Sequence, residues 1–307
     1  MEWLSIGLLA ATLRVATPLI YAAIGTLFSE RSGVMNIGVE GMMLFGAFTA
    51  VAGSYYTAGP WIGVAAAVAV GALLGLLHAW ACVTLGANQI VSGAAINLLA
   101  VGIPNYLLLA LWNRPGVSPL VAGIEPIRLP LADSMPLVGG LFDALNPLVY
   151  GAFALALAAH FLLFKTPLGL RIRAVGEHPR AADTVGVRVE RLRYLCVVLS
   201  GALAGLAGAY LSVAHLSLFT KQMTQGRGFI AMAAMIFGKW TPLGTLGACL
   251  LFGLAEALQL SLQTQELALP ADLLMALPYL VTLLALAGFV GRARAPAAIG
   301  RPYRKDA

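Results

Sequence analysis

Amide and carboxylate side chains stand within or beside apolar segments of this chain, where they must be paired or face a cavity. In the segment 31–46, Asn36 and Glu40 are four residues apart, so a helix would carry both on one face. A second polar group, around the start of another apolar run, consists of Asn88, Gln89, Ser92 and Asn97. Groups of this kind bind polar solutes through hydrogen bonds, or else they join one helix to another. We expect at least one of them to line a solute pathway.

Charged residues also border the short apolar run at 223–242. Arg227 and Lys239 bracket a stretch of barely one bilayer thickness, and the glycines among them permit the interrupted helices that line transporter cavities. Glu256 stands alone within the apolar segment 242–263 and would suit a proton relay. The sequence therefore leaves a second hypothesis open, an ion-coupled transporter.

Catalytic and metal-binding arrangements do not emerge from the residue pattern. The cysteines Cys82, Cys196 and Cys249 all lie in apolar runs without metal-ligand spacing, which is typical of packing residues. No Gly-Lys-Ser/Thr loop for binding nucleotide phosphates occurs in the sequence, so the chain is not itself an ATPase. We predict that it has no catalytic residue, no metal site and no bound cofactor of its own.

The composition indicates what must position these residues. Of the 307 residues, 60% are hydrophobic and only 10% are charged, and the mean hydropathy is +0.87. Soluble domains carry about 25% charged residues, so most of this chain's outer surface must face lipid. The net charge of +6 is concentrated in one internal loop and the C-terminal segment, a distribution that indicates cytoplasmic loops rather than nucleic-acid binding.

The expected fold class is all-α, a polytopic transmembrane helix bundle of 8 to 10 spans in a single domain over residues 1–307. Small residues four positions apart at 200–212 predict close helix packing. A helix needs about 20 apolar residues to cross the bilayer core. Apolar stretches suited to spanning lie at 3–28, 33–56, 60–86, 90–112, 147–164, 193–216, 223–240, 242–263 and 273–290.

The loops have an asymmetric charge distribution that predicts their sides of the membrane. The Pro/Gly-rich loop 113–146 is nearly charge-balanced, whereas the loop 165–192 and the tail 291–307 are rich in arginine. The positive-inside rule places both basic segments in the cytoplasm and 113–146 outside, with the N-terminus also outside. Within the basic loop, a short stretch after Pro179 is predicted to be helical and to stop at Gly186. It suits either docking to a partner protein or attraction to anionic lipid.

Three long motifs resemble the inner-membrane permease family of bacterial ATP-binding-cassette importers for branched-chain amino acids, simple sugars and nucleosides. They are ERSGVMNIGVEGMML at 30–44, LGANQIVSGAAINLLA at 85–100 and GRGFIAMAAMIFGKWTPLG at 226–244. The resemblance covers essentially the whole chain and is strongest to the nucleoside and simple-sugar branch. A fourth segment, 169–187, resembles the family's coupling segment.

The resemblance implies a permease subunit of the bacterial cytoplasmic (inner) membrane with its C-terminus inside. Its implied partners are an ATP-binding subunit that holds ATP and Mg²⁺, a second related permease (a hetero-pair rather than two identical chains) and an extracytoplasmic solute-binding protein. The coupling residues implied by the matched segment are Gly176, Glu177, Pro179, Ala181, Ala182 and Gly186. The residues predicted for the pathway are Asn36, Glu40, Asn88, Gln89 and Asn97.

The solute and the energy source remain as alternatives. The resemblance favours a nucleoside, with a simple sugar and then a branched-chain amino acid as the next candidates. The ion-coupled hypothesis would instead use Glu40 or Glu256 as its ion site.

Overall fold

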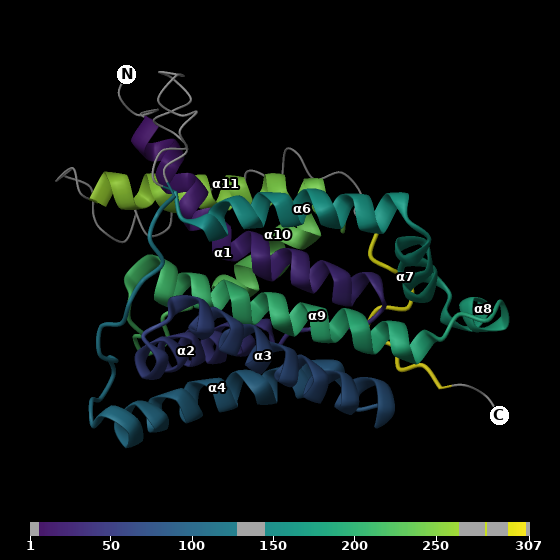
Figure 1. The fold of residues 1–307 in the computed structure, drawn as a ribbon. Coiled ribbons are helices and arrows are strands. Elements are labelled where there is room, and N and C mark those ends of the chain that lie inside the picture. The colour runs from purple at the N-terminus through teal and green to yellow at the C-terminus, as the bar shows by residue number, and fades with distance from the viewer. Residues whose placement is uncertain (1–5, 128–144, 264–279, 281–293, 305–307) are drawn as a thin grey trace.

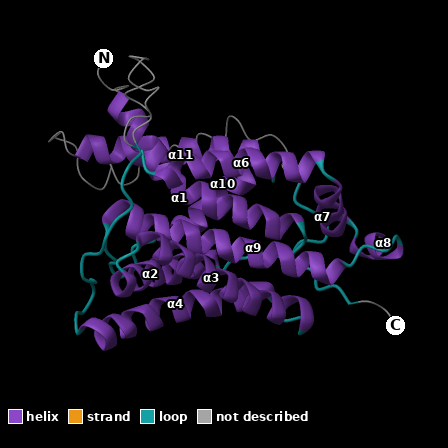
Figure 2. Cartoon of the chain, in the orientation of Figure 1, coloured by secondary structure: helices purple, strands orange, loops and turns teal. Residues whose placement is uncertain are grey.

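The fold was analysed in a computed structural model that describes residues 6–127, 145–263, 280 and 294–304. Within these residues the secondary structure is helical, and the two isolated β-bridges form no strand (Figure 2). The all-α class predicted from the sequence is confirmed.

Six of the described helical segments are long and apolar enough to cross a membrane. They are α1 (Ile6–Arg31), α3 with the π-helical turn η1 (Pro60–Thr84), α4 (Gln89–Trp112), α6 (Pro147–Lys165), α9 with the π-helical turn η3 (Val189–Leu216) and α11 (Pro242–Gln263). Helix α2 (Val39–Thr57) lies among them and packs against α3, α4 and α9. The predicted span at 273–290 lies almost wholly outside the described residues, so the total of 8 to 10 spans stays a prediction.

Helix α10 (Arg227–Phe237) is shorter than the predicted span 223–240. Its eleven residues extend about 16 Å at 1.5 Å per residue, roughly half the thickness of a bilayer core. The helix begins only after Gly226, which has a φ of +82°, and it ends before Lys239, whose φ is +55°. These left-handed conformations interrupt the helical backbone at both ends, so α10 is a half-helix.

Glycines bring the helices at the centre of the bundle into backbone contact. A Cβ atom on Gly201 of α9 would overlap the carbonyl oxygen of Gly71 of α3, and the reverse substitution would meet the same obstacle. On another face of α9, a Cβ on Gly208 would overlap the carbonyl oxygen of Met43 in α2. The close packing predicted for 200–212 is confirmed, and α9 forms the core of the bundle.

The basic loop forms two helices rather than one. Helix α7 (Pro167–Glu177) is followed after a single residue by α8 (Pro179–Thr184). Gly186, with a φ of +84°, ends this pair as the sequence predicted. Figure 1 shows α7, α8 and the C-terminal tail, defined here as residues 294–304, together at one end of the bundle. The start of α1 and the described part of the 113–146 loop lie at the opposite end. We refer to the first as the α8 end.

Candidate functional site

Glu40, at the start of α2, joins this helix to the start of α10. One carboxylate oxygen accepts a hydrogen bond from the Gly226 amide at 2.8 Å, and the other accepts one from the Gly228 amide at 2.7 Å. Both amides belong to the N-terminus of α10, which carries the positive end of the helix dipole and favours an anion. Gly228 permits the approach, because a Cβ there would crowd the Glu40 backbone. Glu40 therefore supplies the cap that α10 lacks in its own sequence.

Arg227 and Glu256 form an ion pair beside this cap. Their side chains are about one fifth exposed and link the start of α10 to α11. The glutamate that looked solitary in the sequence therefore has a cationic partner. We define the mid-bundle junction as Glu40, Gly226, Arg227, Gly228 and Glu256.

Asn36 and Asn97 fix the segment that leads into α2. Asn36 is fully buried and donates to the Ser200 hydroxyl of α9 at 2.9 Å, while its Oδ1 has no partner among the described residues. Asn97 accepts from the Gly41 amide at 2.8 Å and donates to the Ile37 carbonyl at 3.0 Å. The two amides tie this segment to α9 and α4 respectively.

Gln89 and Asn88 differ although they are adjacent. Gln89 is buried, and its side-chain oxygen accepts from the Met35 amide at 2.7 Å. Asn88 is exposed and caps α4, accepting from the amides of Ile90 and Val91. Four of the five predicted pathway residues thus gather around the 35–41 segment, and Asn88 lies apart at a helix terminus. In this conformation all five make contacts that hold backbone or side chains in place, and their predicted part in a pathway stays a prediction.

The tail contacts the predicted coupling residues at the α8 end. The Ala298 amide donates to the Gly176 carbonyl at 2.9 Å, and the Ala297 amide donates to the Glu177 carboxylate at 3.2 Å. Gly176 must be small, since a Cβ there would overlap the carbonyl oxygen of Arg31 at the end of α1. The predicted coupling segment is therefore bound to both the bundle and the tail.

Arg193 is a structural residue that the sequence analysis missed. It is 1% exposed, and its guanidinium donates to the Ser32 carbonyl at 3.2 Å and to the Arg301 carbonyl at 3.0 Å. It also lies 6.0 Å from the centre of the Tyr303 ring. Nothing in the basic run around it distinguishes this arginine from its exposed neighbour Arg191, because only the fold brings the tail over it.

Tyr303 anchors the far end of the tail. It is buried in a small apolar cluster with Val175, Ala182 and Val189, which belong to α7, α8 and α9. Among the predicted coupling residues, Ala182 therefore packs inward, whereas Ala181 is exposed. A bulky residue at 182 would disturb this cluster, so position 181 gives the cleaner test of a surface role.

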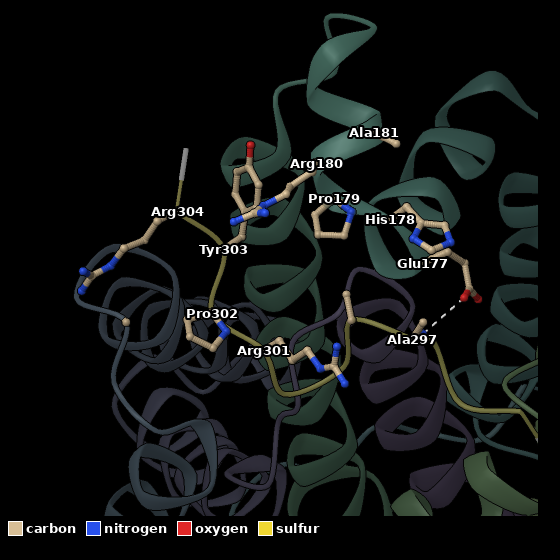
Figure 3. Close-up of a pocket in the computed structure, with 12 residues that line it drawn as sticks. Glu177, His178, Pro179, Arg180, Ala181, Ala297, Arg301, Pro302, Tyr303 and Arg304 are labelled. Atoms are coloured by element: carbon tan, nitrogen blue, oxygen red, sulfur yellow. Dashed lines mark hydrogen bonds between the residues drawn. The ribbon is translucent and has the colours of Figure 1, made fainter. Parts of the chain in front are cut away.

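A cavity of about 760 Å³ opens between α8 and the tail (Figure 3). We call it the tail cavity. Its lining residues are Gly86, Glu177, His178, Pro179, Arg180, Ala181, Ala297, Ala298, Arg301, Pro302, Tyr303 and Arg304. Three of these carry a guanidinium group and one carries a carboxylate, so the cavity is basic. Three of the six predicted coupling residues line it, namely Glu177, Pro179 and Ala181.

The six long apolar helices that pack with the capped half-helix α10 are typical of a polytopic membrane protein. Residues 8–286 match the family described as the branched-chain amino acid transport system permease component. The chain belongs to this family of permease subunits.

Individual relatives extend the comparison. The chain is 45% identical over 306 residues to the guanosine ABC transporter permease protein NupQ of Bacillus subtilis, covering 96% of this chain and 95% of the relative. It is 41% identical over 272 residues to the putative glucose ABC transporter permease protein TsgC13 of Haloferax volcanii, covering 86% and 80%. Bacillus subtilis has a second matching chain, the guanosine ABC transporter permease protein NupP, 27% identical over 260 residues, covering 79% of this chain and 71% of the relative. Two related guanosine permease proteins therefore occur in one bacterium.

Proposed function

We propose that this chain is one of two related permease subunits of an ATP-driven importer that carries nucleosides across the bacterial cytoplasmic membrane. The observation that carries the proposal is the 45% identity to a guanosine permease over nearly the full length of both chains. The glucose permease matches at lower identity and over less of each chain, which ranks a sugar second.

The proposed division of labour assigns ATP and Mg²⁺ to a separate ATP-binding subunit at the α8 end, which would be the cytoplasmic side. An extracytoplasmic binding protein would deliver the solute at the opposite end. The exposed helix α8, held to the bundle by the Tyr303 cluster, supports this arrangement, because a partner that moves α8 would also move α7 and α9. A solute site with different affinity in the two bundle conformations would then give net transport.

Among the described residues, no observation favours the ion-coupled alternative. Both oxygens of Glu40 accept hydrogen bonds from α10, and Glu256 is paired with Arg227. A carboxylate that binds and releases an ion has to change its partners during each cycle. In this structure the Glu40 carboxylate is bound to the start of α10, and the Glu256 carboxylate is bound to Arg227.

Gentle detergent purification of the tagged protein from its native host, with mass-spectrometric identification of what accompanies it, tests the assembly. The expected result is a stoichiometric ATP-binding subunit plus a second polytopic chain. Recovery of the chain alone, under detergents that preserve known complexes, would overturn the proposal.

Uptake of labelled guanosine in proteoliposomes, with unlabelled nucleosides, glucose and leucine as competitors, tests the solute. Competition by glucose or leucine but not by nucleosides would contradict the nucleoside assignment.

A further inference from the structure

The tail is fixed against the bundle along its described length, so its exposed side chains are presented at set positions. The Ala298 and Gly300 amides donate to the carbonyls of Gly176 and Gly33, at 2.9 and 3.2 Å. The buried Arg193 guanidinium holds the Arg301 carbonyl at 3.0 Å. A segment whose backbone is bound to α7, α9 and the residues just after α1 in this way forms part of the α8 end rather than a free extension.

Fixing the backbone leaves the arginine side chains of the tail available at the surface. Arg301 and Arg304 are exposed, and both line the tail cavity. Arg180, from the start of α8, lines it too, while the Glu177 carboxylate accepts a hydrogen bond from the Ala297 amide. Figure 3 shows Arg180 of α8 above Arg301 and Arg304 of the tail, with Glu177, the last residue of α7, beside Ala297. The cavity therefore suits an anionic occupant.

The size and place of the cavity indicate what that occupant is. A volume of about 760 Å³ accommodates a short group of side chains and is too small for a folded domain. The cavity lies between α8 and the tail, and both of these segments stand at one end of the bundle (Figure 1). This position favours a partner that approaches along the bundle axis.

We propose that the tail and α8 together form a docking site for an acidic segment of the ATP-binding subunit. Carboxylates of that segment would pair with Arg301 and Arg304, since guanidinium groups bind carboxylates through paired hydrogen bonds. The inference rests on the proposed function, because it takes an ATP-binding subunit as the partner. It adds a second contact surface, contributed by the tail, to the one implied by the coupling segment.

The test compares an R301E/R304E double variant with wild type by retention of the ATP-binding subunit on the tagged permease over a series of NaCl concentrations. The substitutions leave the anchoring contacts intact, because these use the Arg301 backbone, Arg193 and Tyr303. We expect the partner's affinity to fall at least about tenfold, with release at lower salt than from wild type. Arg294→Glu is the matched control, since Arg294 is exposed on the same tail but does not line the cavity. R301K/R304K should keep most of the binding.

Each outcome decides between the possibilities. Retention of the ATP-binding subunit by R301E/R304E at the wild-type level would overturn the docking inference and leave the proposed function standing. Unchanged retention together with weaker binding to phosphatidylglycerol vesicles would assign the cavity to lipid head groups and would equally overturn it. Failure of the wild-type chain to retain any ATP-binding subunit would overturn the proposed function as well. Equal losses in Arg294→Glu and R301E/R304E would show that general tail charge, rather than the cavity, governs the association.

Discussion

At the mid-bundle junction, Glu40 uses both carboxylate oxygens on the backbone of a neighbouring helix, whereas at the α8 end Arg301 and Arg304 extend exposed side chains around an open cavity. Both regions bring charge to a contact between distant segments. In the interior the charge is bound to the chain's own groups and supports the fold. At the α8 end the fold instead fixes a backbone, so that charged side chains remain free to bind a partner. Substitutions should therefore affect stability in the first region and assembly or coupling in the second.

The largest loss of stability is expected for Glu40→Ala. The change leaves the buried amide of Gly228 without its acceptor, at about 1–3 kcal/mol, and the half-buried amide of Gly226 adds a smaller loss. The apparent Tm in detergent should fall by several degrees, and uptake should fall with it. Glu40→Gln keeps one acceptor oxygen, so its Tm should lie between those of wild type and Glu40→Ala. If Glu40→Ala had the same Tm and uptake rate as wild type, the mid-bundle junction would not stabilise the fold.

Gly208→Val should come next, because its side chain would overlap the Met43 carbonyl of α2. Overpacking of this kind costs about 1–3 kcal/mol. Gly102→Val is a matched control on α4, since a Cβ there meets no atom within 4 Å. Thermal unfolding of the two purified variants measures the difference. Similar losses in both would show that valine in a helix, rather than the α2–α9 contact, is responsible.

A smaller effect is expected for Asn88→Ala, which removes the exposed N-cap of α4 at a cost of about 1 kcal/mol. Asn88→Ser should restore most of that stability, because serine also caps helices. Uptake separates the two roles of this residue. If Asn88 lines the pathway, as the sequence predicts, uptake falls in both variants. A cap-only role would instead let serine restore uptake along with stability, and the pathway prediction for this residue would be wrong.

The two regions also differ in how far the sequence predicted them. Periodic apolar stretches predicted the long helices, and the small residues around Gly205 predicted the contacts of α9, because both patterns are local in the chain. Glu40 was predicted to line the pathway, yet its partners at 226 and 228 lie almost 190 residues away, and no local spacing indicates that pairing. The half-helix α10 was predicted as a longer span because its apolar composition does not show the left-handed turns that end it.

The α8 end shows the same limit for the tail. Basic composition predicted that the loop and the tail share one side, and Pro179 and Gly186 predicted the short helix between them. The role of Arg193 depends on the tail passing over it, and the burial of Tyr303 depends on three separate helices meeting there. Those contacts join residues that are more than a hundred positions apart. The tail cavity is therefore a property of the tertiary fold alone.

The central claim, that the α8 end acts on a partner while the interior holds the fold, is tested most directly at Ala181. Ala181→Arg places a large side chain on the cavity side of α8, and Thr184→Arg places the same side chain on an exposed position of α8 that does not line the cavity. The measurement is uptake per inserted molecule in proteoliposomes with the ATP-binding subunit, alongside the Tm of each variant. We predict that Ala181→Arg keeps a wild-type Tm but loses uptake by about tenfold or more. Thr184→Arg should keep both a wild-type Tm and near-normal uptake. Normal uptake by a correctly inserted Ala181→Arg protein would contradict the account.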